Sequence, residues 1–413
     1  MCEKLKIALV TPSLPPFSTD GISSSHYNLF MLLKDKYIVN IYTYNECSVP
    51  CNPESRLFRN GLSCTSKKIL GAFIKLFLIV IGSRGIVYQF RDALFGALVG
   101  LKIIKTIREF EPNIIIVPDQ GPTSAFWPKL IGTKIIYVSH HNSMRFHRTP
   151  LLGKHSEIDA RLGRYLEQCA INRANFVICP SHYMKDVFEE TYDYSGPIDV
   201  IPNMINEKGM DLIKAALLKD MMCLSFSTPV IYIPSAGSVY KGRSFVIEII
   251  NEIYSRYNKE IGFYLSGNID DQLRKSLDSL PSQVRIFAPG TVANHDNLAY
   301  VKACTLCVSP TIIENFSMAL LEAQYFGIPV VSFDIGGNCE IIQDGSTGYL
   351  VRFPDVHELV NKSLKLLFSE ELSHEFAQSA KKIVRMKTNA LIMLNKYSNI
   401  FDSLQSSSNV VRK

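Results

Sequence analysis

Two glutamates, Glu314 and Glu322, are spaced so that both can serve one ligand. The apolar run Leu306–Ser309 predicts a strand, and the residues after Ser317 predict a helix that Gly327 ends. Glu314 therefore precedes the helix, and Glu322 lies inside it. Two helical turns rise about 10 to 12 Å, so the two carboxylates suit two parts of one extended ligand.

Between the glutamates, the segment Asn315-Phe316-Ser317-Met318 leads into the predicted helix. Backbone N–H groups at a helix start have no partner inside the helix, and with the helix dipole they favour an anion such as a diphosphate. Carboxylates would repel that anion unless the ligand also offers hydroxyl groups to them, as a nucleotide sugar does. The purely structural alternative is that Glu314 complements the dipole and Glu322 is a solvated helix residue.

The sequence around these residues resembles the E-x7-E region of the retaining family-4 glycosyltransferases, which have the two-domain GT-B architecture. The matching run consists of Pro310, Glu314 to Glu322, Gly327-Ile328-Pro329-Val330-Val331, Gly336-Gly337-Asn338-Cys339-Glu340-Ile341-Ile342, Asp344-Gly345 and Gly348. Further similar segments at 173–181, 200–203, 237–242 and 284–287 extend the resemblance over most of the chain.

The resemblance implies a role for each matching residue of the second half. Glu314 would lie beside the donor sugar, the amides of residues 316–318 would hold the diphosphate, and Glu322 would bind the ribose. Lys241 would neutralise the diphosphate leaving group as a compact point charge. Family resemblance also suggests front-face displacement, in which a donor phosphate oxygen accepts the proton of the incoming hydroxyl.

The region around Lys241 departs from the family pattern. Members commonly have an arginine just after the glycine that matches Gly237, but this chain has Ser238 there and a shorter loop before the lysine. Arg243 is the candidate to supply the missing charge. Without it, donor affinity or activity would suffer.

Two segments of the N-terminal half also resemble the family. Asp20-Gly21-Ile22-Ser23 stands where the family has a Gly-Gly turn, so the Gly21 amide could approach a phosphate or an acceptor; an ordinary loop is the alternative. Ser139-His140-His141-Asn142 follows the strand predicted at Ile135–Val138. The family has one histidine near the sugar there. His141, next to Asn142, is the preferred match, and His140 is the alternative.

Short apolar runs alternate with helical patterns, which predicts parallel sheets covered by helices on both faces. The predicted strands are Ile7–Val10, Val39–Tyr42, Ile114–Val117, Ile135–Val138, Phe176–Cys179 and Val200–Ile201, then Val230–Ile233, Phe263–Ser266, Val284–Phe287, Leu306–Ser309, Val330–Phe333 and Tyr349–Val351. We expect two Rossmann-like α/β domains, acceptor-binding at 1–205 and donor-binding at 206–385, whose sheets face an interdomain cleft. Residues 386–413 would form a helix returning to the first domain, followed by a frayed tail that begins at Ser403.

The composition is that of a folded protein. The chain has 413 residues, of which 47% are hydrophobic and 20% charged, and this excludes a disordered or fibrous protein. The ten cysteines are scattered and no cleavable signal precedes them, so we expect reduced thiols and a cytoplasmic location. Cys304 and Cys307 have the spacing of a metal pair, but on a strand they would point to opposite faces, and no metal site is expected.

Residues 56–110 are strongly basic, with ten Lys and Arg against Asp92 and Glu109. No apolar run reaches the ~18 to 20 residues of a membrane span, and the nearest, Ile69–Ile81, contains Lys75. The segment either docks on the inner face of an anionic membrane or contains a core helix with solvated lysines. Nucleic acid is not an expected partner, because the basic residues are not interleaved with stacking aromatics.

The resemblance implies retaining transfer of a sugar from a nucleotide-diphosphate-sugar to a hydroxyl of a glycan or lipid-linked acceptor, in the synthesis of cell-surface polysaccharide or glycolipid. No Asp-x-Asp motif can bridge a divalent ion to the diphosphate, so a metal-independent reaction is expected. From another class, the chain could be a catalytically silent GT-B subunit or a glycan-binding module of an assembly complex. An epimerase or a phosphorylase is disfavoured, because neither cleft acid/base carboxylates nor a pyridoxal lysine motif is found.

Overall fold

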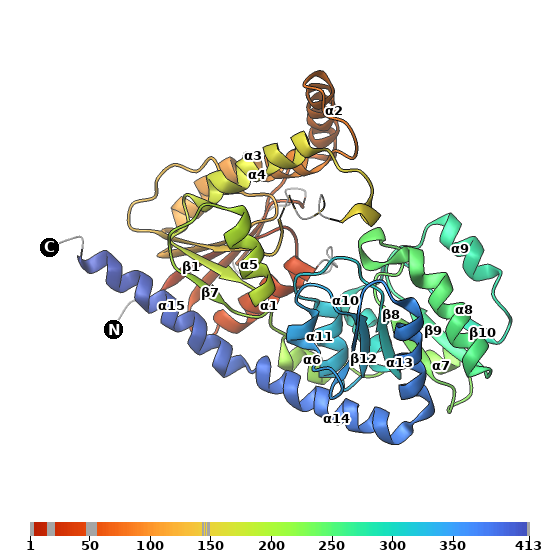
Figure 1. The fold of residues 1–413 in the computed structure, drawn as a ribbon. Helices are drawn as coiled ribbons and strands as arrows, with labels where there is room; N and C mark the ends of the chain where they lie inside the picture. The colour runs from red at the N-terminus through yellow and green to blue at the C-terminus, as the bar shows by residue number, and fades with distance from the viewer. Residues whose placement is uncertain are drawn as a thin grey trace. The chain divides into compact units, whose positions relative to one another are not determined.

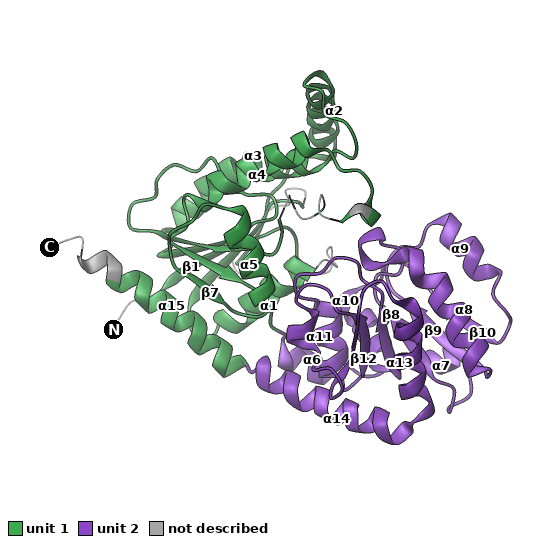
Figure 2. Ribbon diagram, viewed as in Figure 1, with its two compact units in different colours: residues 1–204, 390–413 green, residues 205–389 purple. Residues whose placement is uncertain are grey.

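The computed structural model describes residues 4–14, 21–46, 56–142, 144, 146 and 149–410. These residues form two compact units (Figures 1 and 2), with residues 1–204 and 390–413 in unit 1 and residues 205–389 in unit 2. Three features of the sequence analysis lie outside the described residues: Asp20 of the predicted turn, the last three residues of the tail, and Cys2, Cys47 and Cys51.

Unit 1 is built on a seven-stranded sheet in the order β3-β2-β1-β4-β5-β6-β7, and every neighbouring pair is parallel. The strands are β1 (Lys6–Thr11), β2 (Ile38–Thr43), β3 (Leu57–Arg59), β4 (Ile114–Pro118), β5 (Lys134–Val138), β6 (Phe176–Cys179) and β7 (Ile198–Val200). A parallel sheet needs a crossover between successive strands, and the helices of the unit supply most of these connections.

Both faces of this sheet are covered, as the alternation of β1 shows. Ala8 and Val10 belong to a core with the helices of one face, and Ile7 and Leu9 belong to a core with those of the other. The helices of the first face are α3 (Gln89–Phe110), α4 (Glu157–Ile171) and α5 (His182–Thr191), and those of the second are α1 (Gly21–Leu33) and α15 (Ala390–Val410).

The basic segment 56–110 contains β3 and two helices with different environments. Helix α3 is a core helix, because Ala97, Ile103 and Ile107 are buried. Helix α2 (Cys64–Val80) buries only Ile74 and Leu78. Of the two alternatives for this segment, a core helix and a membrane-docking segment, α3 fits the first whereas α2 does not.

Unit 2 contains a six-stranded sheet in the order β10-β9-β8-β11-β12-β13, again parallel throughout. The strands are β8 (Val230–Ile233), β9 (Ile261–Leu265), β10 (Val284–Phe287), β11 (Leu306–Ser309), β12 (Val330–Phe333) and β13 (Gly348–Val351). This is the strand order of a doubly wound dinucleotide-binding fold, with the switch point between β8 and β11. The predicted α/β class with two parallel sheets is therefore confirmed.

The helices of unit 2 form where apolar residues recur at helical spacing. Val246, Ile249, Ile250 and Ile253 place one buried face on α8, which is followed by the cap residue Asn258 in the left-handed conformation. The helices are α6 (Glu207–Leu212), α7 (Leu218–Met221), α8 (Val246–Tyr257), α9 (Asp271–Asp278), α10 (Asn294–Lys302), α11 (Met318–Tyr325), α12 (Asn338–Ile341), α13 (Val356–Phe368) and α14 (Glu370–Lys387).

The C-terminal helix α15 follows the last helix of unit 2 but belongs to unit 1. Its buried residues Met393, Tyr397, Phe401 and Leu404 lie in the same core as β1 and α1. The helix continues to Val410, past the point where the sequence suggested a frayed tail, and Leu404 is one of the contacts that hold it. Among the described residues, no helix is long and apolar enough to cross a membrane.

Candidate donor site and its relatives

The connection from β11 to α11 presents free backbone donors. Ser317 is the N-cap of α11, and its hydroxyl oxygen accepts a hydrogen bond from Leu320 N at 3.5 Å. The side chains of Phe316 and Met318 are buried in the core of unit 2, which fixes the loop. Within the described chain, the backbone N–H groups of Phe316, Ser317 and Met318 donate to no other residue. Three donors are thus available to an anion at the helix start.

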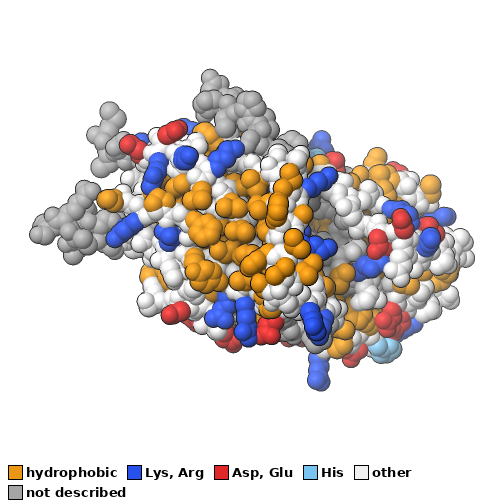
Figure 3. Space-filling model, turned by 90° about the horizontal axis from the view of Figure 1, so that it is seen from above, with side chains coloured by type: hydrophobic (Ala, Val, Ile, Leu, Met, Phe, Trp, Pro, Cys, Tyr) orange, Lys and Arg blue, Asp and Glu red, His pale blue; other side chains and the backbone are white. Residues whose placement is uncertain are grey.

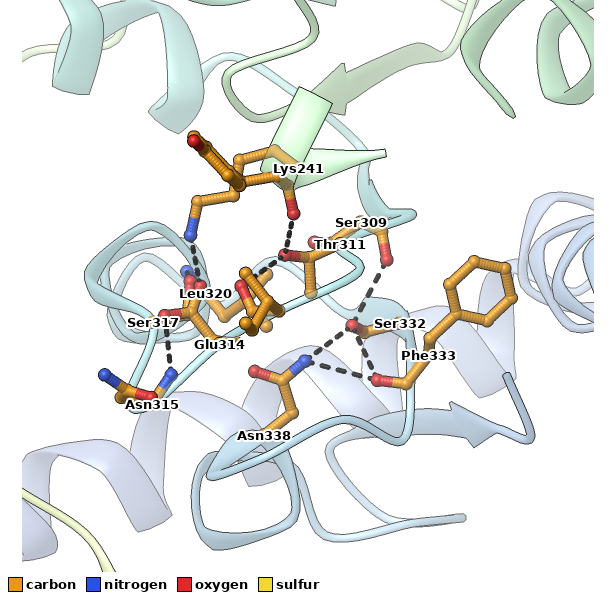
Figure 4. A network of polar contacts seen from close by, with 12 residues as sticks. Lys241, Ser309, Thr311, Glu314, Asn315, Ser317, Leu320, Ser332, Phe333 and Asn338 are labelled. Atoms are coloured by element: carbon orange, nitrogen blue, oxygen red, sulfur yellow. Dashed lines mark hydrogen bonds and ion pairs between the residues drawn. The ribbon is translucent and has the colours of Figure 1, made fainter. Parts of the chain in front are cut away.

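Glu314 and Lys241 form an ion pair beside these donors (Figure 4). Lys241 Nζ lies 2.5 Å from Glu314 Oε2, and the other carboxylate oxygen accepts from Asn315 N at 3.1 Å. The Glu314 side chain is 10% exposed, whereas the Lys241 side chain is 33% exposed. The carboxylate is therefore fixed, and the more exposed ammonium group is the partner that can move toward a ligand.

A close contact between two loops positions Lys241. Backbone N–H groups of Ile312 and Ile313 both donate to Tyr240 O, at 3.0 and 3.3 Å. Gly242 has φ +83°, and a Cβ atom there would lie 1.8 Å from Pro310 O. Only glycine fits this approach, which brings the loop after β8 onto the loop after β11.

The structure does not place Arg243 with Lys241 and Glu314. Its guanidinium lies 2.7 Å from Asp270 and also donates to Gln272 Oε1 at 3.2 Å. Ser238 is half-buried, and its carbonyl accepts from Lys241 N at 3.0 Å and from Arg243 N at 3.2 Å, so it shapes the turn that separates the two cations. Arg243 can contact a diphosphate only if it leaves Asp270.

Glu322 lies within α11 and is half-buried. Its carboxylate forms no hydrogen bond or ion pair with any described residue. Burial raises the pKa of its carboxyl to about 8, because water no longer stabilises the charge fully. A ligand that donates hydroxyl groups to this carboxylate would favour its ionised form.

A buried amide connects the neighbouring strand ends below the ion pair (Figure 4). Asn338 Nδ2 donates to Ser332 Oγ at 3.0 Å and to Phe333 O at 3.2 Å, and Ser332 Oγ donates to Ser309 O at 3.2 Å. These bonds join the carboxyl ends of β11 and β12. Asn338 therefore has a positioning role at this edge of the sheet.

In unit 1, His140 and His141 have different surroundings. His140 is 8% exposed, its ring centroid lies 5.3 Å from that of His26, and burial lowers its pKa well below the usual value. His141 is half-buried; its backbone N–H donates to the carboxylate of Asp119, and its ring lies 5.5 Å from that of Phe146. Both follow β5, as expected, but only His140 faces a second histidine.

Sequence reasoning missed His26 and Asp119. His26 lies on α1, where its Nδ1 is 3.0 Å from Val10 O, and Gly21 is the exposed first residue of that helix. Asp119 follows β4 directly and accepts from Ser139 Oγ at 3.2 Å. Burial raises the pKa of Asp119 to about 8. Its place after a strand was a readable signal, since ligands bind at the carboxyl ends of parallel strands.

Cys304 and Cys307 are both buried, the first just before β11 and the second inside it. Burial raises the pKa of both thiols. In the described part of the chain, no three His, Cys, Asp or Glu residues are grouped so that they could hold a metal ion.

Two family models match the chain. Residues 227–383 match "Glycosyl transferases group 1", and residues 66–208 match "Glycosyltransferase Family 4". The first match contains the Lys241–Glu314 pair and α11, and the second contains α3, Asp119 and the two adjacent histidines. Together the two matches cover most of the chain.

Curated relatives are distant. The poly(ribitol-phosphate) α-N-acetylglucosaminyltransferase of Staphylococcus aureus is 25% identical over 38% of this chain and 32% of its own length. Trehalose synthase of Thermococcus litoralis is 25% identical over 60% of this chain and 62% of its own length. N-acetyl-α-D-glucosaminyl L-malate synthase of Bacillus anthracis is 23% identical over 56% of this chain and 60% of its own length. The chain thus spans less than two thirds of each of these relatives.

Solved structures share the fold over nearly the whole chain. The sucrose-phosphate synthase of Thermosynechococcus elongatus has a TM-score of 0.72 at 15% identity, with 98% of this chain and 100% of that one covered. Anabaena HepE in complex with UDP-glucose has a TM-score of 0.67 at 16% identity, with 97% and 100% covered. With two matching family models and this GT-B fold, the chain belongs to the group 1, family 4 glycosyltransferases.

Proposed function

We propose that this protein is a retaining glycosyltransferase that uses a nucleotide-diphosphate-sugar as donor. The observation that carries the proposal is the ion pair between Lys241 and Glu314 beside the three free N–H groups that begin α11. Lys241 and the three N–H groups offer a cation and backbone donors to a diphosphate. Glu314 offers a carboxylate to sugar hydroxyls. The half-buried carboxyl of Glu322 is available to ribose hydroxyls.

The proposed reaction is a front-face displacement. The bond between the anomeric carbon and the phosphate oxygen breaks, and the acceptor oxygen forms the new glycosidic bond on the same face. The acceptor's proton passes to an oxygen of the departing diphosphate, so no protein base is needed. Charge develops on that diphosphate, and Lys241 together with the amides of residues 316–318 stabilises it there. His140 and His141 are the proposed contacts to the sugar from unit 1, and Gly21 offers an amide to the phosphate or the acceptor.

The names of relatives support a nucleotide-sugar donor and a polyhydroxylated or phosphate-bearing acceptor. HepE binds UDP-glucose in its solved structure, and the staphylococcal relative transfers N-acetylglucosamine to a poly(ribitol-phosphate). We infer a hydroxyl of a glycan or lipid-linked acceptor for this chain, in the synthesis of a cell-surface polysaccharide or glycolipid. The proposed location is the cytoplasmic side of the membrane.

Helix α2 is the proposed contact with the membrane. Its outward face, which we call the docking face, consists of Ile69, Phe73, Leu76 and Val80, exposed by 56 to 76%. Seen from the side of α2 (Figure 3), hydrophobic side chains form a broad patch with Lys and Arg side chains along its edge. No acidic residue occurs in α2. An apolar face with a basic surround fits an anionic bilayer surface.

The decisive experiment combines donor binding and donor turnover. A panel of UDP-, GDP-, ADP- and dTDP-sugars is tested by thermal shift and by release of nucleoside diphosphate. One donor should stabilise the wild type and be hydrolysed slowly. Glu314→Ala and the size-matched Glu314→Gln should still be folded and bind nucleotide, but turnover should be lost. Glu248→Ala, an exposed position on α8, is the control.

Two results would contradict the proposal. Unchanged turnover in both Glu314 variants would remove this residue from the mechanism. A wild type that binds and hydrolyses none of the nucleotide sugars would instead support the catalytically silent subunit or glycan-binding module considered from the sequence.

A further inference from the structure

Unit 1 contains a basic pocket that the proposed donor chemistry does not use. It has a volume of about 550 Å3 and is lined by residues of α2, α3 and two loops: Tyr44, Asn45, Lys67, Lys68, Gly71, Ala72, Lys75, Arg91, Asp92, Phe95, Gln120 and Gly121. The lining thus holds four cations and one carboxylate. We refer to it as the basic pocket.

The cations of the basic pocket are poorly neutralised. Arg91 is paired with the neighbouring Asp92 at 2.9 Å, but both side chains are about half exposed, so the pair is weak. Lys67 Nζ donates to Asn45 O at 2.9 Å, which is a neutral partner. Lys68 and Lys75 have no partner among the described residues. Several poorly neutralised cations around one cavity favour a bound anion.

The pocket also lies where ligands bind in a parallel sheet. Tyr44 and Asn45 follow the carboxyl end of β2, and Gln120 and Gly121 follow that of β4. These strands flank β1 on either side. The same edge carries His140, which follows β5. Open α/β sheets bind their ligands outside the carboxyl ends of the strands.

Close backbone packing fixes the walls of the pocket. A Cβ atom at Gly96 of α3 would lie 2.3 Å from Gly121 O, so only glycine allows the helix to approach the loop after β4 this closely. The hydroxyl of Tyr44 donates to Gln120 O and joins the two loops. Arg91 and Phe95 are therefore carried to the pocket by a firmly placed helix.

The helix that supplies three of the four cations also carries the docking face. Lys67, Lys68 and Lys75 of α2 line the pocket, while Phe73 and Leu76, on either side of Lys75 in the sequence, are exposed. A ligand here would have its anionic group among the cations and an apolar portion near the same helix. Lysine and arginine side chains bind phosphate oxygens through charge-assisted hydrogen bonds.

We propose that the basic pocket binds the phosphate group of a lipid-bearing acceptor, so that this enzyme acts on a polyprenyl-phosphate-type or similar anionic lipid-linked substrate. The proposal rests on the proposed glycosyltransferase function and specifies its acceptor class. Arg91, Lys67 and Lys75 bind the phosphate, and α2 lies at the membrane that holds the lipid.

The test measures binding without donor, so that it does not depend on catalytic activity. Isothermal titration calorimetry compares farnesyl phosphate, farnesol and inorganic phosphate as probes. Farnesyl phosphate should bind the wild type at least about tenfold more tightly than farnesol or inorganic phosphate, since it alone has both a phosphate group and an apolar chain. The double variant Lys67→Gln/Arg91→Gln should weaken its binding by about ten- to a hundredfold.

Matched variants assign the binding to this pocket. Lys105→Gln/Arg108→Gln removes one lysine and one arginine from α3 outside the pocket and should leave the affinity for farnesyl phosphate unchanged. If the double variant unfolds, Lys75→Gln is measured in its place, because it changes only one exposed side chain. Lys241→Ala should also leave farnesyl phosphate binding unchanged, which separates this site from the proposed donor site.

Three results would overturn the proposal. Equal binding of farnesol and farnesyl phosphate would show that no phosphate is recognised. Loss of farnesyl phosphate binding in Lys241→Ala would place the phosphate in unit 2. Equally strong competition by soluble dihexanoylphosphatidylglycerol would show that the pocket binds the headgroups of bulk membrane lipids and not an acceptor.

Discussion

The guanidinium of Arg243 lies 2.7 Å from the carboxylate of Asp270, and this pair keeps it from the Lys241–Glu314 site. Asp270 is also the N-cap of α9 and accepts from Leu273 N at 2.9 Å. That backbone hydrogen bond and the charge of Arg243 lower the pKa of Asp270, so it stays ionised and retains its partner at neutral pH. Family members commonly have an arginine at the position of Ser238. If Arg243 takes over the role of that arginine, it must leave Asp270 to bind the diphosphate.

Asp270→Asn is therefore expected to tighten binding of nucleoside diphosphate. Asparagine still caps the helix but no longer competes for the guanidinium. Because an exposed ion pair is weak, the gain should be small, no more than about fivefold. Calorimetric titration of the nucleotide measures it.

The neighbouring exposed carboxylate gives the control for this prediction. Asp271→Asn removes the same charge one residue later and should have no effect on nucleotide affinity. Arg243→Gln in the Asp270→Asn background should reverse the gain. If Asp270→Asn binds nucleotide as the wild type does, Arg243 has no contact with the donor.

Glu322 should make nucleotide binding depend on pH. Its pKa is raised to about 8, so the carboxyl is largely protonated at neutral pH in the free protein. Ribose hydroxyls donate to the ionised form, and affinity should therefore rise from pH 6 to pH 8. If only the ionised form binds, the affinity for the nucleotide can rise by at most about tenfold per pH unit. Titration of the protein with UDP at several pH values measures the slope.

The variant Glu322→Gln separates this effect from the ionisation of the nucleotide itself. Both proteins experience the same change in the ligand, so only the difference between their slopes reports Glu322. The variant should show the shallower slope. Identical slopes would argue that Glu322 does not contact the ribose.

The sequence predicted the sheets well because their strands are short apolar runs between helical patterns. The strand Leu57–Arg59 was missed, since three residues that end in arginine carry no readable alternation. The exposure of α2 could not be read either. A helix with apolar residues on several sides looks the same in the sequence whether a core or a membrane covers it, and only the structure shows that Ile74 and Leu78 alone of α2 are buried.

The sequence also predicted only part of the candidate site. Lys241 and Glu314 belong to motifs that resemble the family, and the structure brings them together. The pairing of Arg243 with Asp270 depends on two loops that approach one another in the folded unit, and no local pattern encodes it. Asp119 and His26 are single residues outside any motif, and their significance follows from burial next to the adjacent histidines.

Asp119 should make the stability of the protein fall as pH rises. Its carboxyl has a pKa of about 8 in the folded protein, against an ordinary value of 3.8. Between these values the folded state binds more protons than the unfolded state, so the free energy of unfolding decreases from about pH 4 to about pH 8. Asp119→Asn keeps an acceptor for Ser139 and His141 but does not ionise. It should be more stable than the wild type at pH 8 by on the order of a few kcal/mol.

Chemical denaturation of both proteins between pH 5 and pH 8 checks this difference. Glu322 also titrates in this range, but it contributes equally to the wild type and the variant. Asp186→Asn, an exposed position on α5, should match the wild type throughout. A wild type and an Asp119→Asn variant with parallel pH profiles would show that Asp119 is ionised in the folded protein.

Binding to anionic vesicles tests the role of α2 in membrane docking. Lys67→Gln/Lys68→Gln/Lys75→Gln should reduce sedimentation with vesicles that contain phosphatidylglycerol, because each basic residue near an anionic surface contributes about 1 kcal/mol. Three such losses correspond to a partition coefficient roughly a hundredfold lower at low salt. Phe73→Ser/Leu76→Ser/Val80→Ser should also reduce sedimentation, since it removes the apolar side chains that the bilayer would bury.

The two sets of substitutions differ in their expected response to salt. Attraction of the lysines to the surface is screened within a Debye length of about 8 Å at physiological ionic strength, whereas burial of the docking face is not. The lysine variant should therefore lose its salt dependence, and the apolar variant should retain it. Lys259→Gln/Lys275→Gln/Lys382→Gln removes the same charge from exposed positions of unit 2 and should sediment like the wild type. If the lysine and apolar variants also sediment as the wild type does, α2 does not contact membranes, and its exposed apolar side chains need another explanation.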